Sequence, residues 1–249
     1  MPSKLASGVI VASKPKPMET GIDGLDNILV GGIPEKSQIL LMGGPGTGKT
    51  LMGFEVLYNW ARKGRPCAFI ALDERPDDIL ENVRNTFTGM DDIHELIEKR
   101  LLVIGGYESA LKIATNAEDE SSYSMGNLMS EIEGIIKSIN AEIVVVDSLS
   151  FLKLMLGKSL LYNKSISSLV SNLRRLETTS ILTLSIPYYD RKKLKFGQEL
   201  VLFDGVMVLY KGTGTDDGKL TMEIVKMRGN RSDALFSGYS ITSSGIKFK

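Results

Sequence analysis

The segment 43–50, with the sequence GGPGTGKT, constrains the fold of this chain more than any other stretch. It matches every fixed position of the phosphate-binding loop, or P-loop, in which a strand leads through a glycine-rich turn into a helix. The apolar run 38–42 before it is typical of a buried strand, and the run 51–57 after it is typical of a helix. This context predicts a phosphate site at the amino end of that helix, where the helix dipole and unpaired N–H groups favour anions.

Each residue type in the loop has a chemical task. The glycines let backbone N–H groups converge on phosphate oxygens, Lys49 can reach the outer phosphates, and the Thr50 hydroxyl can ligate Mg²⁺. The alternative is a glycine-rich turn that binds no ligand, which the matching strand and helix disfavour. We therefore predict a nucleotide-binding segment made of Gly43, Gly44, Pro45, Gly46, Thr47, Gly48, Lys49, Thr50 and Leu51.

Length, charge and cysteine content set broader limits. The chain has 249 residues, 43% of them hydrophobic, which suits one large domain over residues 18–249 behind a mobile tail, 1–17. Thirty basic and thirty acidic side chains cancel, so overall charge gives no reason to expect nucleic acid or a membrane as the main partner. The single Cys67 and the lack of any run of about 18 apolar residues predict a soluble cytoplasmic protein.

Strand and helix patterns alternate along most of the chain. This alternation predicts an α/β fold with a mostly parallel sheet that helices cover on both faces. The polar segment 105–123 is predicted to be a mobile loop, and the last part of the chain to add an antiparallel hairpin, 206–210 with 220–225, and one or two short strands. The expected core strands are 38–42, 67–72, 101–104, 143–147 and 180–184, and the expected helices are 51–63, 76–87, 92–99, 125–139 and 160–177.

Carboxylates end two of the predicted strands. Asp147 follows an unbroken apolar strand, the position from which such folds supply the acid that holds Mg²⁺. Asp73 and Glu74 end the strand that we expect beside the P-loop strand, and Glu74 is the preferred base for orienting or deprotonating an attacking water. A structural alternative is that these acids cap the helix that starts at Pro76, which concerns Asp73 most.

Three further features carry charge. Lys226 and Arg228 lie two residues apart on the second hairpin strand, so they share a face and could neutralise phosphate, although a solvated edge strand is an equal alternative. The basic run 191–196 after two tyrosines is typical either of a loop that stacks on nucleic acid or of a solvated surface loop. His94, the only histidine, falls on a polar helix away from the motifs, so we assign it no metal or catalytic role.

Together these motifs resemble a KaiC domain of the RecA-like ATPase superfamily, of the single-domain archaeal type. The resemblance covers about residues 18–249 and rests on the segments 20–26, 31–34, 43–50, 73–74, 146–148 and 226–229. It implies ATP with Mg²⁺ bound between neighbouring subunits of a ring, commonly a hexamer. Lys49 and Thr50 would bind phosphate and Mg²⁺, Asp73 and Glu74 would match the paired catalytic carboxylates, and Asp147 would match the acid on the Mg²⁺ side. Lys226 and Arg228 would reach a neighbour's phosphates.

Three departures from the family pattern affect the expected activity. Asp73 replaces the usual glutamate, Ser185 stands where a glutamate or glutamine often lies near the γ-phosphate, and the segment 230–232 differs from the usual Thr-Ser-His. The favoured function is a slowly hydrolysing ring ATPase whose nucleotide state regulates an unidentified protein partner. The alternatives are a recombinase-like ATPase that contacts DNA through residues 188–196 and a nucleotide-binding structural module without turnover.

Overall fold

One nine-stranded sheet forms the centre of the computed structural model, which describes residues 16–115, 121–157, 160–187, 197–212, 218–229 and 236–249. Most of the predicted tail, residues 1–15, lies outside the described residues. The sheet strands are β3 (Gln38–Gly43), β4 (Cys67–Ala71), β5 (Leu102–Gly105), β6 (Ile143–Asp147), β7 (Thr179–Ser185), β8 (Gly205–Lys211), β9 (Leu220–Met227), β10 (Phe236–Thr242) and β11 (Gly245–Phe248).

Helices and one small sheet complete the described fold. Two short strands, β1 (Pro17–Met18) and β2 (Ile33–Pro34), pair with each other beside the main sheet. None of the described helices has the length and hydrophobicity that crossing a membrane requires. The helices are α1 (Leu25–Ile28), α2 (Lys49–Ala61), α3 (Pro76–Thr86), α4 (Ile93–Glu98), α5 (Tyr107–Thr115), α6 (Ser121–Ile139), α7 (Leu149–Leu156) and α8 (Leu160–Arg175), with a 3₁₀ helix at Gln198–Leu202.

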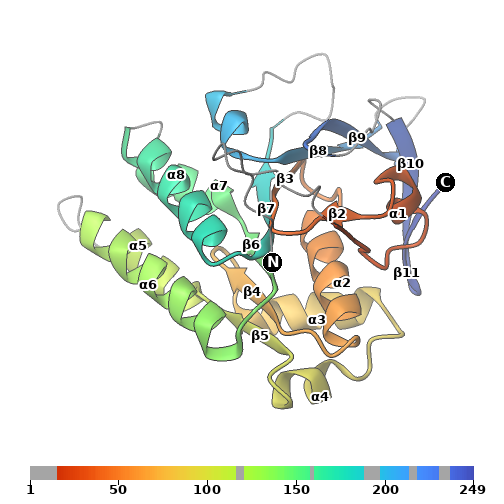
Figure 1. The fold of residues 1–249 in the computed structure, drawn as a ribbon, viewed down its shortest axis with the longest axis horizontal. Helices are drawn as coiled ribbons and strands as arrows, with labels where there is room; N and C mark the ends of the chain where they lie inside the picture. Colours follow the sequence, from red (N-terminus) through yellow and green to blue (C-terminus); the bar gives the residue numbers. More distant parts are fainter. Residues whose placement is uncertain (1–15, 116–120, 158–159, 188–196, 213–217, 230–235) are drawn as a thin grey trace, which may run out of the picture.

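The strand order is β11-β10-β9-β8-β3-β7-β6-β4-β5 (Figure 1). The six strands from β8 to β5 are parallel, whereas β9, β10 and β11 are antiparallel to their neighbours. This arrangement confirms the predicted α/β fold with a C-terminal antiparallel hairpin. It also shows that the expected neighbour of the P-loop strand is wrong, because β7 and β6 lie between β3 and β4.

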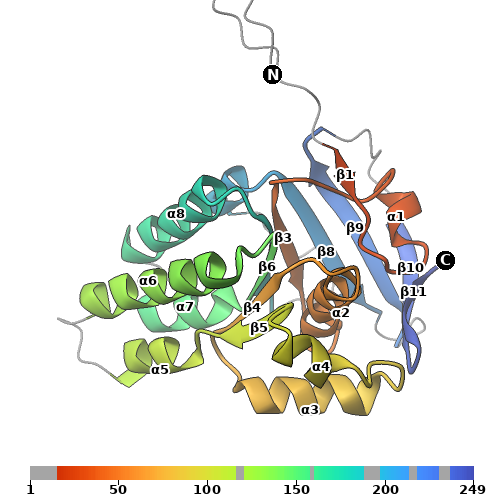
Figure 2. The ribbon, with the colours of Figure 1, turned by 60° about the horizontal axis from the view of Figure 1, so that its bottom comes forward.

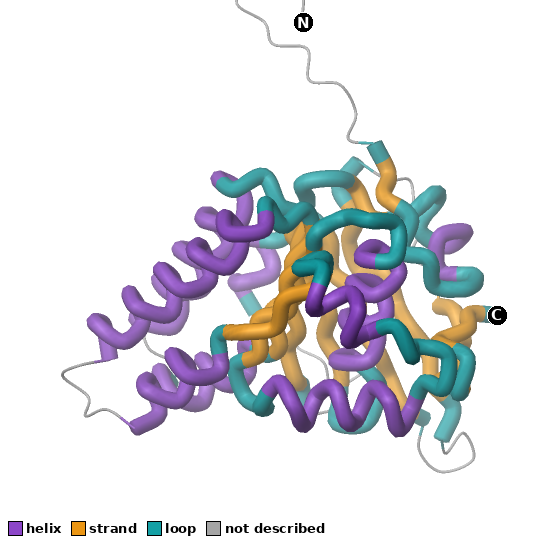
Figure 3. The backbone as a smooth tube through the Cα atoms, turned by 90° about the horizontal axis from the view of Figure 1, so that it is seen from below, coloured by secondary structure: helices purple, strands orange, loops and turns teal. Residues whose placement is uncertain are grey.

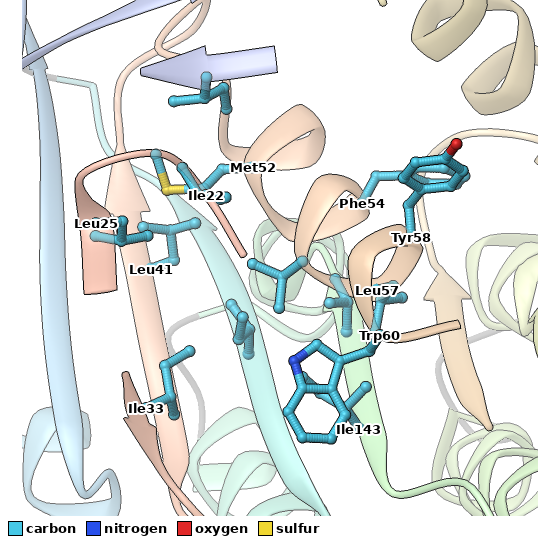
Figure 4. Close-up of a cluster of buried hydrophobic side chains, with 14 of the residues drawn as sticks. Ile22, Leu25, Ile33, Leu41, Met52, Phe54, Leu57, Tyr58, Trp60 and Ile143 are labelled. Carbon is cyan, nitrogen blue, oxygen red and sulfur yellow. The ribbon is translucent and has the colours of Figure 1, made fainter. Parts of the chain in front are cut away.

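Helices cover both faces of the sheet (Figures 2 and 3), as continuous apolar runs along the parallel strands require. On β3, Leu41 packs with α2, α3 and α4 on one face, while Leu40 and Met42 pack with α6, α7 and α8 on the other. Figure 4 shows Leu57 and Trp60 of α2 among the buried residues of the first face. Because α2 packs against the strands, its first turn has a fixed position relative to the sheet, and so does the P-loop that leads into it.

The segment 105–123 is a correction to the sequence prediction. Where we predicted a mobile loop, α5 occupies Tyr107–Thr115, and α6 begins at Ser121 rather than near Met125. The helix α5 packs on α6 and buries Ala110 completely, whereas Leu111 stays 42% exposed. The polar and acidic stretch that follows, with Glu118, Asp119 and Glu120, dominates the composition of the segment, and this is why the short helix before it was missed.

The helix α7 was also missed. It follows β6 almost directly, so the sequence 149–156 has no glycine or proline to mark a new element. Its buried residues, Leu149, Leu152 and Leu156, have spacings of three and four. This spacing is the signal that could have predicted a helix there.

Buried Glu55 joins α2 to β11, and we expect it to make stability depend on pH. Its carboxylate accepts the Ile246 N–H at 3.0 Å, and burial raises the pKa of Glu55 to about 7 from 4.5. The folded chain therefore holds this proton more tightly than the unfolded chain, so the free energy of unfolding falls by about 3 kcal/mol between about pH 4.5 and 7.

Glu55→Gln should remove this dependence, because the amide oxygen still accepts the Ile246 N–H but carries no charge. Chemical denaturation of both proteins should give similar stability near pH 4.5 and a more stable variant, by about 3 kcal/mol, at pH 8. Parallel pH profiles of wild type and variant would contradict the prediction.

Candidate functional site

The P-loop connects β3 to α2 at the carboxyl end of the sheet. Gly46 and Gly48 have positive φ values of 72° and 83°, which side chains rarely adopt. The first bond within the helix runs from the Met52 N–H to the Gly48 carbonyl at 2.8 Å. The N–H groups of the first helical turn before Met52 have no partner in the helix, so they can bind an anion.

Two side-chain hydrogen bonds within the loop converge on one carbonyl group. The Gly44 carbonyl accepts the Thr47 hydroxyl at 2.8 Å and the Lys49 ammonium at 3.1 Å. Lys49 is only 9% exposed, and this burial lowers its pKa, while Asp147 and then Asp73 oppose the shift. A buried ammonium beside a helix amino end provides strong attraction for phosphate.

Thr50 and Asp147, the two residues proposed from the sequence to hold Mg²⁺, contact each other across the site. The Thr50 hydroxyl donates to one Asp147 carboxylate oxygen at 2.6 Å, and the Thr183 hydroxyl of β7 donates to the other. Asp147 is 4% exposed. A hydroxyl and a carboxylate oxygen in contact fit the hard oxygen donors that Mg²⁺ prefers.

Thr183 was not a candidate from the sequence. Within the strand segment 180–184 it reads as one more β-branched residue, and only the register of β7 beside β6 reveals its role. A hydroxyl between the buried apolar residues Leu182 and Leu184 needs a hydrogen-bond partner, and this need was the signal available in the sequence.

Asp73 and Glu74 follow β4 and lie on the same edge as Asp147. The Ser148 hydroxyl donates to Asp73 at 2.9 Å. Both acids lie at the surface, but neighbouring atoms displace enough water to raise the pKa of each, and nearby acids raise it further, Asp147 for Asp73 and Asp73 for Glu74. Raised pKa values make both groups stronger bases than ordinary carboxylates.

The capping alternative does not describe these acids. The residue at the N-cap of α3 is Arg75, and no side chain caps that helix. Asp73 contacts Ser148 instead, on the segment that follows Asp147. The acidic pair therefore belongs to the P-loop side of the molecule, although β4 is not the strand beside β3.

Lys226 and Arg228 lie at the opposite end of the sheet from the P-loop of the same chain. The Lys226 ammonium donates to the Phe203 carbonyl at 2.6 Å, and Arg228 forms an ion pair with Asp204 at 3.2 Å. Asp204 bonds to Gln38, the first residue of β3, whereas the P-loop starts at the last. The separation along β3 is roughly 16 Å, so neither cation can reach its own chain's P-loop.

The remaining candidates stay outside the cluster. His94 is an exposed residue of α4 beside Arg84. Ser185 is exposed at the end of β7, and its N–H bonds to the Ser150 hydroxyl at 2.7 Å. The basic run 191–196 and the segment 230–232 lie outside the described residues. Among the residues that are described, no three His, Cys, Asp or Glu side chains gather as metal ligands.

A comparison with protein families identifies the family of the chain. The family model described as "ATPase: KaiC" matches residues 18–249. The chain belongs to the KaiC ATPase family. Curated relatives of this chain include a UPF0273 protein of Aeropyrum pernix, 33% identical over 240 residues that cover 92% of each chain. The circadian clock oscillator protein KaiC of a Picosynechococcus strain is 28% identical over 230 residues, which cover 92% of this chain but 43% of the clock protein.

The fold of this chain also matches a solved structure of a KaiC-like protein. The crystal structure of a KaiC-like protein from the archaeon Pyrococcus horikoshii OT3 aligns with a TM-score of 0.79 and 27% sequence identity. The alignment covers 94% of this chain and 99% of the other. The KaiC resemblance inferred from short motifs is therefore confirmed over nearly the whole chain.

Proposed function

We propose that this KaiC-family chain binds ATP with Mg²⁺ at the P-loop and hydrolyses it slowly. The observation that carries the proposal is the contact between Thr50 and Asp147 directly beside the buried Lys49. These three residues supply a hydroxyl and a carboxylate, which suit a metal cation, and an ammonium, which suits the phosphates of a nucleoside triphosphate. Family membership supports the ATPase class of the chemistry.

The residues divide the work of binding. Lys49 and the N–H groups of the loop would hold the outer phosphates, and Thr50 and Asp147 would hold Mg²⁺. The metal, when bound, would neutralise phosphate charge. Thr183 keeps one Asp147 oxygen occupied, so the carboxylate is fixed in rotation and presents its other oxygen to the Thr50 side.

Glu74 is proposed as the base that takes a proton from the attacking water. Neighbouring atoms that displace water raise its pKa, as does Asp73, so the carboxylate binds a proton more readily than an ordinary glutamate. Asp73 is held by Ser148 and would act mainly through its charge on Glu74. Slow turnover is expected because Ser185, with its short side chain, replaces the acid or amide that often lies near the γ-phosphate.

The complete site is proposed to lie between subunits of a ring, commonly a hexamer in this family. The position of Lys226 and Arg228, roughly 16 Å along the sheet from their own P-loop, supports action on a neighbour's phosphates. We propose that the nucleotide state of this ring regulates a protein partner in the cytoplasm. No described contact favours the DNA-binding alternative, since its loop, residues 188–196, lies outside the described residues.

Lys49→Ala tests the binding step. Loss of the buried ammonium should weaken Mg-ATP binding by about 100-fold, because the loop N–H groups cannot replace a full charge on the outer phosphates. Isothermal calorimetry measures the affinity. The matched control is Lys63→Ala, an exposed lysine just past the other end of α2, which should bind ATP as the wild type does. Equal affinity in Lys49→Ala and wild type would remove the P-loop as the nucleotide site.

A further inference from the structure

The C-terminal strand β10 reaches back to the P-loop through a tyrosine. Tyr239 is 4% exposed, and its hydroxyl donates to the Thr47 carbonyl at 2.6 Å. Its ring stacks on Phe248 of β11, with centroids 5.2 Å apart, which fixes the direction of the hydroxyl. Burial raises the pKa of Tyr239, so the hydroxyl stays protonated and remains a donor.

The Thr47 carbonyl belongs to the same rigid unit as the Gly48 N–H. A trans peptide is planar, and its C=O and N–H bonds point in opposite directions. A hydroxyl that holds the carbonyl on one side therefore aims the Gly48 N–H to the other side. That N–H lies just before Lys49, in the part of the loop expected to surround phosphate.

A second side chain of β10 contacts the same peptide. Ile241 is two residues after Tyr239 and so lies on the same face of the strand. A Cβ atom at position 48 would lie 2.6 Å from the Ile241 Cδ1 atom, so this isoleucine fills the space that a side chain at Gly48 would need. The two β10 residues thus hold the Thr47–Gly48 peptide by a hydrogen bond and by packing.

We propose that Tyr239 is a positioning residue for phosphate binding, and that it aims the Gly48 N–H by anchoring the Thr47 carbonyl. This inference rests on the proposed binding of ATP at the P-loop. It assigns a role in the nucleotide site to a residue 192 positions away from its partner in the sequence. It also gives the antiparallel extension of the sheet a function, which is to support the loop from the side opposite the phosphates.

Tyr239→Phe tests the proposal because it removes one oxygen and keeps the buried ring. The affinity for Mg-ATP should fall about tenfold, since the carbonyl loses its partner and the peptide can turn. The affinity for inorganic tripolyphosphate, which has no base or ribose, should fall by the same factor. Calorimetry measures both ligands on the same preparations.

The matched control is Tyr58→Phe. Tyr58 is a buried tyrosine on α2, the helix that follows the loop, but its hydroxyl bonds to the Asp92 carboxylate and lies 3.1 Å from the Gly89 carbonyl, away from the P-loop. Both variants should lose stability in thermal unfolding, and only Tyr239→Phe should lose phosphate affinity. A purely structural hydroxyl would instead give two variants that bind like wild type.

The outcomes separate this inference from the proposed function. Wild-type affinity in Tyr239→Phe, or an equal loss in Tyr58→Phe, would overturn the positioning role while ATP binding itself stands. A loss for ATP without a loss for tripolyphosphate would also overturn it, because the hydroxyl would then act on the base or ribose. A wild-type chain that binds neither ligand would overturn the proposed function and this inference together.

Discussion

Glu74→Gln is expected to bind Mg-ATP with unchanged affinity and to hydrolyse it about 10²- to 10⁴-fold more slowly than wild type. The amide keeps the size and polarity of the glutamate, but it cannot accept a proton or attract the water by charge. Glu74 is exposed, so the substitution should leave the core and the stability unchanged. Phosphate release at saturating ATP measures turnover, and calorimetry measures binding.

Two further variants make the Glu74 test specific. Asp73→Asn should lose less activity, because Asp73 is bonded to Ser148 and acts through its neighbour. Asp77→Asn changes an exposed acid in the first turn of α3 and should hydrolyse ATP normally. Wild-type turnover in Glu74→Gln would place the base elsewhere, and a lower ATP affinity would show that the residue serves binding.

Arg228→Ala should lower turnover by about 10³-fold while ATP binding changes little, since a cation supplied by a neighbour acts on the charge of the transition state. Its own pair with Asp204 is exposed, so the loss of that pair should cost little stability. Arg175→Ala is the matched control, because it removes another exposed arginine, paired with Glu133, and should keep wild-type turnover.

Mixing subunits tests whether the site is shared. Lys49→Ala subunits bind ATP only weakly but keep Arg228, whereas Arg228→Ala subunits bind ATP but lack that cation. Each should be nearly inactive alone, and mixed rings should recover activity. Native mass spectrometry establishes that the rings are mixed. No recovery in such rings, or normal turnover by a monomer, would leave Arg228 as a surface residue that pairs with Asp204.

The parts of the site that are continuous in sequence were predictable. The P-loop carries its own strand and helix signals, so residues 43–50 could be placed at a helix amino end without tertiary information. Asp147 could be proposed as a site residue because folds with a P-loop supply an acid from the end of an apolar strand. Its contact with Thr50 is as that motif implies.

The parts that depend on strand order were not predictable. Hydrophobic patterns show that strands are buried but not which strands are neighbours, so β4 was placed beside β3 although two strands separate them. The same limit hides Thr183 and Tyr239, whose hydroxyls find partners only through the register of distant strands. The distance between Arg228 and its own P-loop likewise depends on the pairing of β8 with β3, which no local pattern encodes.

The central claim, slow ATP hydrolysis at the P-loop site, is tested most directly by steady-state phosphate release from Mg-ATP. The wild-type protein is measured after its oligomeric state has been determined, and Glu74→Gln gives the background rate. The account predicts slow release that is well above the Glu74→Gln rate and that single-stranded DNA leaves unchanged. Release no faster than in Glu74→Gln would contradict hydrolysis at this site and favour a nucleotide-binding module without turnover. Release that requires single-stranded DNA would contradict the proposed regulatory ATPase and favour the recombinase-like alternative.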